Sequence, residues 1–423
     1  MLRQLLAMAM GLAACKKSAS DAAVQGAGES IGRWKKTWEL IVSSPTDEGT
    51  KSEDACNDFV ATAKGDLFAV GFGTALVSKD SQRDVVIRRV AADGKELLES
   101  WPEVFDAAKG NDSAQTVAVD AQGSLYVGGS ARNYESAESA LDGWIRKFAP
   151  SGQEDVFNWD KKIADDRLVG GFETVEDIVT SATSVYAAGH YNSSGWLKRY
   201  SLAGEEASDW HVEETTRPSR ADAVALDTKG NVYLAGFSRN GAQPFVWLKK
   251  YLPTGKEDVA GWNKKLTVDI VEGTVSPRLA VDGADNIFLA VTGHNLVSAT
   301  SGLDWWLKKY NPDGSDNGAF DEKIDGGADD DVQGLFVDTA GNVVIAGSGV
   351  SIVSPESGKD LWLRFFDQSG IESKADEIRI DGGASAGANA VGVVSGNLIV
   401  CGYGTNLKDP ASATDFWLMR FSR

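Results

Sequence analysis

The chain repeats a block of about fifty-five residues seven times, and this period constrains its fold more than any other feature. The clearest marker of a block is a Trp-Leu/Ile-basic-basic-aromatic run, found at residues 144–148, 196–200, 247–251 and 306–310. Looser copies begin at Val86, Trp362 and Trp417. So regular a period indicates one supersecondary unit, copied so that each copy buries its apolar faces against its neighbours.

One repeat, residues 112–163, shows how each unit is expected to fold. Apolar strands are expected at 116–119, 124–129 and 143–148, with a fourth around 158–163. The turn Asp120-Ala-Gln-Gly123 joins the first two, because its Asp can accept backbone N–H groups and its Gly permits a tight exit. Four short antiparallel strands per repeat predict an all-β fold, a seven-bladed β-propeller of four-stranded blades.

The two ends of the chain predict how the ring closes. The seventh repeat supplies three strands, at 390–394, 397–403 and 415–421, and has no segment left for a fourth. Residues 34–41, near the N-terminus, match the fourth strands that begin at Trp159 and Trp262. We therefore expect an N-terminal strand to complete the last blade, which removes exposed sheet edges and makes 34–423 a single propeller domain.

The repeat units are similar to those of a known family. Units of the form AVDxxGNVYxAGxS…DxWLxKYxxxG resemble bacterial SBBP-type β-propeller repeats, and the likeness spans residues 34–423. The third repeat departs most, since Ser181-Ala-Thr-Ser184 replaces the Asp-x-x-Gly turn. The resemblance implies a secreted or surface-attached propeller. It carries over no catalytic residues.

The N-terminus reads as an export signal. Arg3 precedes a short apolar stretch over residues 5–14, and Leu12-Ala-Ala-Cys15 resembles the lipobox of bacterial lipoproteins. In that family the signal is cut before the cysteine, which then carries several acyl chains. We expect a signal peptide at 1–14, lipidation of Cys15 and a flexible tether over 15–33; an ordinary secretory signal is the alternative. The residue after the cysteine is Lys16 rather than Asp, and in the lipoproteins of enteric bacteria this favours the outer membrane of the cell envelope.

Charge and cysteine content narrow the partners and the compartment. Lys+Arg number 42 against 61 Asp+Glu, and a net charge of −19 argues against nucleic-acid binding and against adsorption to anionic lipid, leaving the lipid anchor as the membrane contact. Cys56 and Cys401 fall in the first and last blades, which adjoin in a closed ring. A disulfide between them is possible in an oxidising envelope, and two buried free thiols are the alternative.

Neither a metal centre nor a catalytic motif stands out. His190, His211 and His294 show no metal-ligand spacing. The acidic runs 313–316 and 329–331 leave calcium possible, although neither fits an EF-hand-like loop. The chain contains no Gly-x-Ser-x-Gly elbow and no P-loop. We therefore expect no cofactor and no assigned catalytic residue.

Residues that recur in every repeat are interpreted as structural. The paired basic residues of the third strands, such as Lys249 and Lys250, should pack their stems and meet an acidic neighbour. The repeated Trp residues should fill the wedges between adjacent blades.

Function is expected where the repeats differ. The loops between the second and third strands, at 73–83, 130–141, 292–303, 347–359 and 404–414, should share one face with the connections between blades. The candidate contact residues there are Asn133, Tyr134, Tyr191, Asn192, Arg239, Asn240 and Asn295, around an acidic pore mouth of Asp54, Asp112, Glu173, Asp330 and Asp331.

The leading hypothesis for function is a lipid-anchored, monomeric propeller that binds an envelope protein or polymer through this face. The alternatives are a lyase or hydrolase that uses acidic residues at the central pore, and a structural surface protein.

Overall fold

Short strands make up almost all of the regular structure. The computed structural model describes residues 31–44, 51–78, 81–97, 101, 104–106, 110–134, 140–163, 171–214, 218–240, 243–268, 276–408, 410 and 412–423. In this part of the chain the one helical element is a 3-10 turn, η1 (Lys374–Asp376). Within these residues no helix reaches the length and apolar character that a membrane crossing requires.

The strands pair in groups of four, and each group is called a blade. The first strands of blades 1 to 7 are β2 (Ala55–Ala61), β6 (Gly110–Val119), β10 (Glu173–Thr180), β14 (Ser219–Leu226), β18 (Arg278–Val281), β22 (Asp330–Val337) and β26 (Ala386–Val394). The second strands are β3 (Leu67–Thr74), β7 (Leu125–Ala131), β11 (Ser184–Tyr191), β15 (Val232–Asn240), β19 (Ile287–His294), β23 (Val343–Val350) and β27 (Asn397–Gly404). The third strands are β4 (Gln82–Val90), β8 (Asp142–Phe148), β12 (Ser194–Ser201), β16 (Gln243–Tyr251), β20 (Leu303–Tyr310), β24 (Lys359–Phe366) and β28 (Asp415–Ser422). The fourth strands are β5 (Val104–Phe105), β9 (Lys161–Ile163), β13 (Glu206–Glu213), β17 (Lys264–Thr267), β21 (Asp316–Ile324), β25 (Ile378–Ile380) and β1 (Lys35–Val42).

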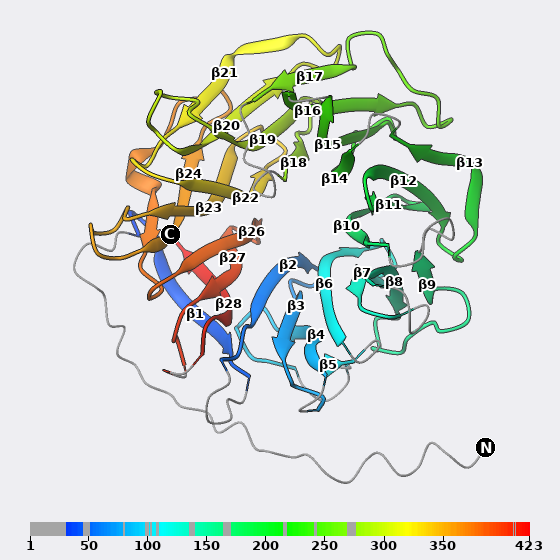
Figure 1. Cartoon of the computed structure of the whole chain (residues 1–423), viewed down its shortest axis with the longest axis horizontal. Coiled ribbons are helices and arrows are strands. Elements are labelled where there is room, and N and C mark those ends of the chain that lie inside the picture. The colour runs from blue at the N-terminus through cyan, green and yellow to red at the C-terminus, as the bar shows by residue number, and fades with distance from the viewer. Residues whose placement is uncertain are drawn as a thin grey trace.

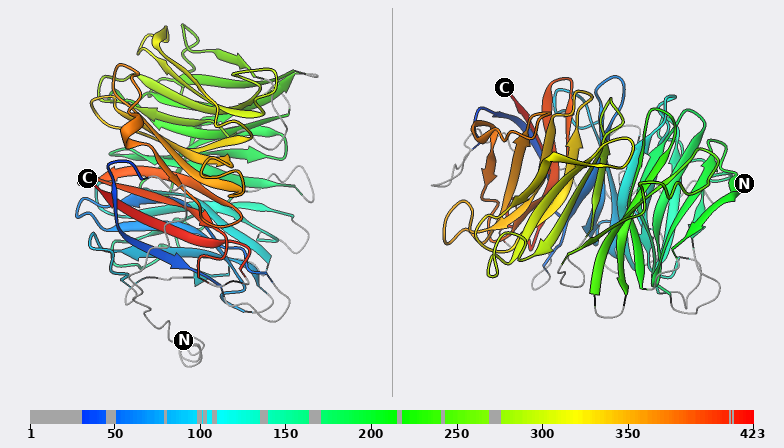
Figure 2. Two further views of the ribbon diagram at one scale, coloured as in Figure 1. Left: turned by 90° about the vertical axis from the view of Figure 1, so that its left-hand side faces the viewer. Right: turned by 90° about the horizontal axis from the view of Figure 1, so that it is seen from above.

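The blades form a ring around a central axis, with the first strand of each nearest the centre (Figure 1). Side views show that the turns and loops gather at the two ends of the ring (Figure 2). Pairing within each blade is antiparallel, while a short parallel pairing of Gln82 with Gly110 and of Arg83 with Asn111 links blades 1 and 2. The predicted all-β class is confirmed, and the fold is a β-propeller.

The N-terminal strand closes the ring as predicted. β1 pairs with β28 from Lys35 opposite Ser422 to Val42 opposite Phe416. The register corrects one detail of the sequence match. Ile41 lies opposite the marker Trp417, as Lys162 lies opposite the marker of blade 2, so Trp38 rather than Trp34 occupies the position of Trp159.

A disulfide joins the first and last blades. Cys56 of β2 and Cys401 of β27 are bonded, with their Cα atoms 5.4 Å apart and a sequence separation of 345. Both side chains are fully buried in the cluster that packs blade 7 against blade 1. The possible disulfide is thus present, at the point where the ring closes.

The hydrophobic core is divided among the blade interfaces. Each of the seven clusters of buried residues combines side chains from two adjacent blades. Trp144, Trp196 and Trp247 are fully buried in these clusters, as predicted. Blade 5 differs, because Trp306 is only partly buried and its neighbour Trp305 packs 4.6 Å from Trp362 instead. Stability therefore depends on neighbouring blades rather than on any blade alone.

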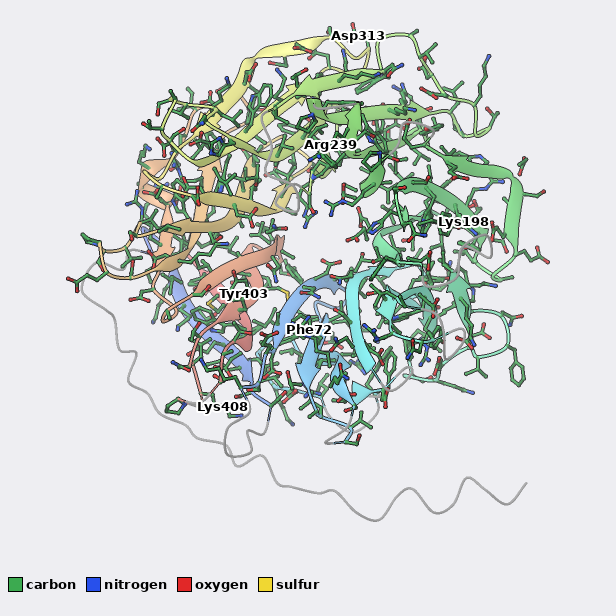
Figure 3. All side chains as sticks on the ribbon, in the orientation of Figure 1. Phe72, Lys198, Arg239, Asp313, Tyr403 and Lys408 are labelled. Atoms are coloured by element: carbon green, nitrogen blue, oxygen red, sulfur yellow. A yellow bond between two sulfur atoms is a disulfide. The ribbon has the colours of Figure 1, made fainter. Side chains whose placement is uncertain are left out.

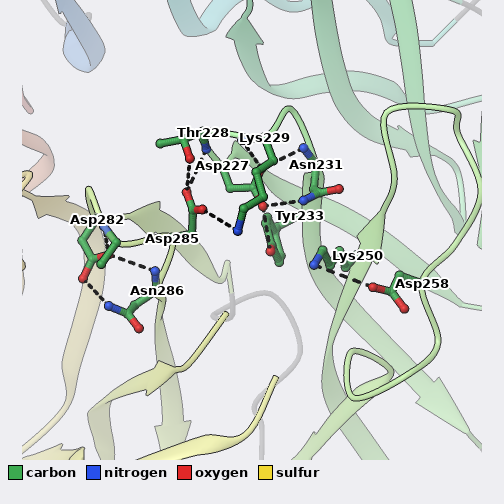
Figure 4. Close-up of polar contacts among 11 residues, drawn as sticks. Asp227, Thr228, Lys229, Asn231, Tyr233, Lys250, Asp258, Asp282, Asp285 and Asn286 are labelled. Carbon is green, nitrogen blue, oxygen red and sulfur yellow. Dashed lines mark hydrogen bonds and ion pairs between the residues drawn. The ribbon is translucent and has the colours of Figure 1, made fainter. Parts of the chain in front are cut away.

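In the Asp-x-x-Gly turns the Asp side chain accepts hydrogen bonds from the backbone, as predicted. Asp227 Oδ1 accepts hydrogen bonds from the backbone N–H groups of Lys229 and Asn231, each at 2.9 Å (Figure 4). In blade 3 the hydroxyl of Ser181 takes over this role, accepting from the N–H of Ser184 at 3.0 Å. The turn survives the loss of Asp because an Oγ acceptor can also satisfy the backbone.

The basic residues of the third strands are structural, as interpreted from their recurrence. In six blades the basic residue two positions after the start of the marker lies within 4.0 Å of an acid eight positions later, at the start of the fourth-strand segment. These pairs are Arg88–Glu96, Arg146–Glu154, Lys198–Glu206, Lys249–Glu257, Lys308–Asp316 and Arg364–Glu372.

Candidate functional site

One end of the ring carries the loops between second and third strands together with the connections between blades, and we call it the loop face. Four of its loops have one design. Each begins with a residue whose φ is positive and ends nine residues later at a buried Asp. The pairs of first and last residues are Ala75 and Asp84, Asn295 and Asp304, Ser351 and Asp360, and Asn406 and Asp415.

The terminal Asp holds its loop by hydrogen bonds. Asp304 Oδ2 accepts from the N–H of Leu296 at 2.6 Å and from the hydroxyl of Ser301 at 2.6 Å. Equivalent bonds reach Asp84, Asp360 and Asp415. These four loops differ in sequence, but one anchor of the same kind holds each of them.

The Asn candidates for ligand contact have a local explanation. Asn133, Asn192 and Asn295 all have φ between 47° and 58°, a conformation that Asn tolerates better than most residues. Asn192 Oδ1 also accepts from the N–H of Phe172 at 2.9 Å. Their recurrence reflects the start of a loop. Asn240 ends β15, and its side chain lies outside the described residues.

The other three candidates, Tyr191, Tyr134 and Arg239, lie in different surroundings. Tyr191 is 6% exposed and packs 5.5 Å from the ring of Trp196, so it belongs to the core. The Tyr134 hydroxyl donates to Asp160 Oδ1 at 2.5 Å, and burial together with this bond raises its pKa to about 12. Arg239, labelled in Figure 3, lies near the end of β15, where its N–H donates to the carbonyl of Pro218.

The acidic pore mouth is largely a set of buried anchors. Asp54, Asp112, Glu173 and Asp330 have almost no solvent exposure, so these four do not present an acidic surface at the pore mouth as predicted. Burial raises the pKa of Asp54 to about 6, while hydrogen bonds from Ser44 and from the N–H of Thr74 oppose that rise. These carboxylates brace the starts of the first strands.

Asp331 is the exception among these acids, because its side chain remains partly exposed. It accepts from the Thr292 hydroxyl at 3.1 Å and from the Gln333 amide at 2.9 Å.

A ring of β-bulges lies at the loop-face ends of the first strands. In six blades the pairing between the first two strands skips one residue, and that residue is polar. The bulged residues are Asn57, Gln115, Glu176, Asp222, Gln333 and Asn389. Bulges re-aim side chains and are common beside functional sites.

Two of the bulged residues belong to an inner charged cluster, which we define as Glu176, His190, Arg220 and Asp222. The His190 ring lies 3.6 Å from Glu176, and Arg220 Nη2 lies 3.1 Å from Asp222 Oδ1. Burial lowers the pKa of His190, so that its imidazole is neutral at pH 7. Burial raises the pKa of Asp222 to about 7; Arg220 opposes the rise and Glu176 adds to it. Asp222 is therefore a buried carboxyl that can gain or lose a proton near neutrality.

Sequence reasoning missed this cluster. A signal was present in six repeats, where the bulged polar residue directly follows a small or apolar one. Without the strand register, nothing distinguished Glu176 and Asp222 from the other acids of the chain.

No His belongs to a possible metal group among the residues that the structure describes, and the side chain of His211 is outside them. Asp313 accepts from the Ser315 hydroxyl at 2.7 Å and Asp316 pairs with Lys308, so the run 313–316 is committed to its turn. The second acidic run is different, because Asp330 meets Asp304 and Asp325.

Comparison with known proteins supports the fold alone. No known family profile matches the chain, and no curated protein matches it. A protein of unknown function from Dyadobacter fermentans is similar in structure, with a TM-score of 0.52 at 10% identity over 92% of this chain and 99% of that one. The WD40 domain of Toxoplasma gondii coronin gives 0.48 at 11% identity, over 90% and 89%. A 6-phosphogluconolactonase candidate from Bacteroides uniformis gives 0.47 at 10% identity, over 82% and 94%.

Proposed function

We propose that this protein is a lipid-anchored component of the bacterial cell envelope that binds a protein or an envelope polymer through the loop face. In this proposal the body is a monomeric seven-bladed propeller of the SBBP type, and Cys15, outside the described residues, carries the lipid that holds it on the outer membrane. The buried disulfide between Cys56 and Cys401 supports a compartment outside the cytoplasm, because such bonds persist in oxidising surroundings.

The main support for a binding role is the ring of polar bulged residues, two of which belong to the inner charged cluster. Two of these polar side chains are already used between blades, since the amides of Asn57 and Asn389 donate to the carbonyls of Ala114 and Cys56. Glu176 and Arg220 keep partly exposed side chains. Around them, Val77 and Phe172 present exposed apolar surface on the same face. A polar centre with apolar neighbours on a rigid scaffold suits a partner surface.

The test is crosslinking in intact cells followed by mass spectrometry. The altered protein carries Arg220→Ala, Glu176→Gln and Phe172→Ser, all on the loop face. We expect one dominant partner with the native chain and its loss with this variant. A second variant, Cys15→Ser, tests the anchor and should move the protein out of the membrane fraction.

The matched control alters exposed apolar residues away from the loop face. Phe157 and Ile371 are exposed and lie beyond the third strands, at the opposite end of their blades. Changing both to Ser should leave the partner in place. A partner that survives the loop-face variant, or that is lost with the control, rules out binding through this face.

A second function is favoured by Asp222. A buried carboxyl whose pKa lies at about 7, beside an arginine, is suited to general acid–base catalysis on an anionic substrate. In that case the protein cleaves an envelope polymer by elimination or hydrolysis. Product release from acidic polysaccharides, abolished by Asp222→Asn, would select the enzyme over the binding protein.

A further inference from the structure

Three carboxylates converge where blade 5 meets blade 6. One oxygen each from Asp304, Asp325 and Asp330 lies within 4.8 Å of the other two. Asp304 ends the loop of blade 5, Asp325 follows β21, and Asp330 begins β22. The first and last of these are fully buried, while Asp325 is exposed. Three segments of the chain thus bring negative charge to one point between two blades.

The two buried carboxylates each keep one oxygen without a partner. Asp304 Oδ2 is occupied by the loop, and Asp330 Oδ2 accepts from the N–H of Gly326, but Oδ1 of both residues is buried without a hydrogen bond. No ion pair of the described residues involves these two acids or Asp325, and the one further hydrogen bond, from the N–H of Val297 at 3.2 Å, goes to Asp304 Oδ2 as well. A buried carboxylate oxygen without a donor is costly, and a bound cation removes that cost.

The next interface around the ring shows what is special here. Residues 324–330 read Ile-Asp-Gly-Gly-Ala-Asp-Asp, and residues 380–386 between blades 6 and 7 read Ile-Asp-Gly-Gly-Ala-Ser-Ala. Register confirms the equivalence, because Asp330 pairs with Gly349 as Ala386 pairs with Gly404. Asp360 and Asp381 repeat Asp304 and Asp325 there, while the third carboxylate is replaced by a buried methyl group.

We propose that Asp304, Asp325 and Asp330 bind a calcium ion that ties blade 5 to blade 6. Ligands that sit 2.3 to 2.6 Å from a Ca²⁺ ion lie at most about 5 Å apart, and the three oxygens meet that limit. Oxygen-only ligands exclude the softer metals that prefer sulfur or nitrogen. Calcium is favoured over magnesium because it accepts irregular sites with several carboxylates.

An entry path for the ion is present. A cleft of about 650 Å³ opens between the two blades and is lined in part by Asp325 and Gly326. Asp325 Oδ1 accepts from the N–H of Gly327 at 2.6 Å, which leaves its second oxygen to face the ion. Water in this cleft can complete the coordination shell, since three carboxylates alone supply fewer than the six to eight oxygens that calcium takes.

The test compares the native protein with two substitutions after removal of metal by a chelator. Asp330→Ala copies the residue that the chain itself packs at position 386, so the variant should fold. Asp381→Ala removes the matching carboxylate from the neighbouring interface and serves as the control. Calorimetric titration with CaCl₂ measures stoichiometry, and thermal unfolding measures the stabilisation.

We expect the native protein and Asp381→Ala to bind one Ca²⁺ per chain, with Tm raised by roughly 3 °C or more at one hundred times the dissociation constant. Asp330→Ala should unfold cooperatively at the chelated Tm and show neither binding nor a shift. Magnesium should bind at least about tenfold more weakly. A native protein that takes up no calcium, or an Asp330→Ala variant that binds as the native protein does, overturns the assignment. Calcium binding by surface acids alone would be the same in the native protein and in both variants, and this result would also overturn the assignment.

Discussion

Single charged residues inside the ring set how its stability responds to pH. Asp222 is 3% exposed, and burial is the main reason that its pKa rises to about 7. An Asp in the unfolded chain titrates near 3.9. Folding therefore favours the protonated carboxyl, so the stabilising contribution is complete below about pH 4 and is lost as the pH rises through about 7.

Replacing Asp222 by Asn should weaken this pH dependence. Between pH 5 and pH 8 the native protein loses free energy of unfolding, and Asp222→Asn should lose roughly 1 to 3 kcal/mol less, because the amide never ionises. Urea unfolding at the two pH values measures the difference. The control is Asp209→Asn, since Asp209 is well exposed. Equal pH slopes for the native protein and Asp222→Asn would show that Asp222 is not the group responsible.

At this scale the sequence predicted residues whose role follows from repetition. The buried Trp residues, the basic pairs and the Cys pair could all be found because their positions recur or adjoin in a closed ring. Asp222 and Asp304 could not, since their environments arise from neighbouring blades. The Asn candidates misled for a related reason: Asn133 and Asn295 recur because a positive φ is needed there, which resembles a binding pattern until φ is known.

Among the elements, the anchored loops are the part that sequence reasoning described least well. Loops of different composition looked variable, yet four share one backbone path set by a terminal Asp. The shared spacing of a hydroxyl three residues before that Asp was visible in the sequence. The role of this spacing could be recognised only once the structure showed that the Asp side chain turns back into the loop.

Removing one anchor should release one loop. Asp360 accepts from the N–H of Val353 at 2.9 Å and from the Ser357 hydroxyl at 2.6 Å, both on the loop face. Asp360→Ala should cost about 1 to 3 kcal/mol, because it leaves these donors without an acceptor. Hydrogen exchange at the Val353 amide should accelerate sharply, and exposed Glu356→Ala should leave it unchanged. An unchanged exchange rate in Asp360→Ala would show that the loop is held by other contacts.

For the whole molecule, closure of the ring is the decisive feature. The seven interface clusters form a circle, and the interface between blades 7 and 1 is the point where distant parts of the chain meet. It is reinforced twice, by β1 on β28 and by the disulfide. The sequence predicted this closure because residues 34–41 match the fourth strands of other repeats. It could not place the bulges, which depend on strand register.

Loss of the disulfide should weaken closure without abolishing it. Replacing Cys56 and Cys401 by Ala should lower the free energy of unfolding by roughly 2 to 5 kcal/mol. Chemical denaturation measures the loss. Because β1 still pairs with β28, the variant should keep its circular dichroism spectrum. Free thiols found in the unreduced, denatured native protein would show that the bond does not form.

The direction of β1 determines which end of the propeller would face the membrane if the N-terminal segment is anchored there. Val42 lies opposite Phe416, next to the Asp that anchors a loop-face loop, while Lys35 lies at the far end of the strand, opposite Ser422. Just before it, Arg33 meets Asp376 of η1, in the connection after β24. The chain therefore enters β1 from the side opposite the loop face, which is where the proposed anchor at Cys15 would connect. In that proposal the loop face would point away from the membrane, and a force applied to the N-terminal end of β1 would load its hydrogen bonds to β28 together in shear.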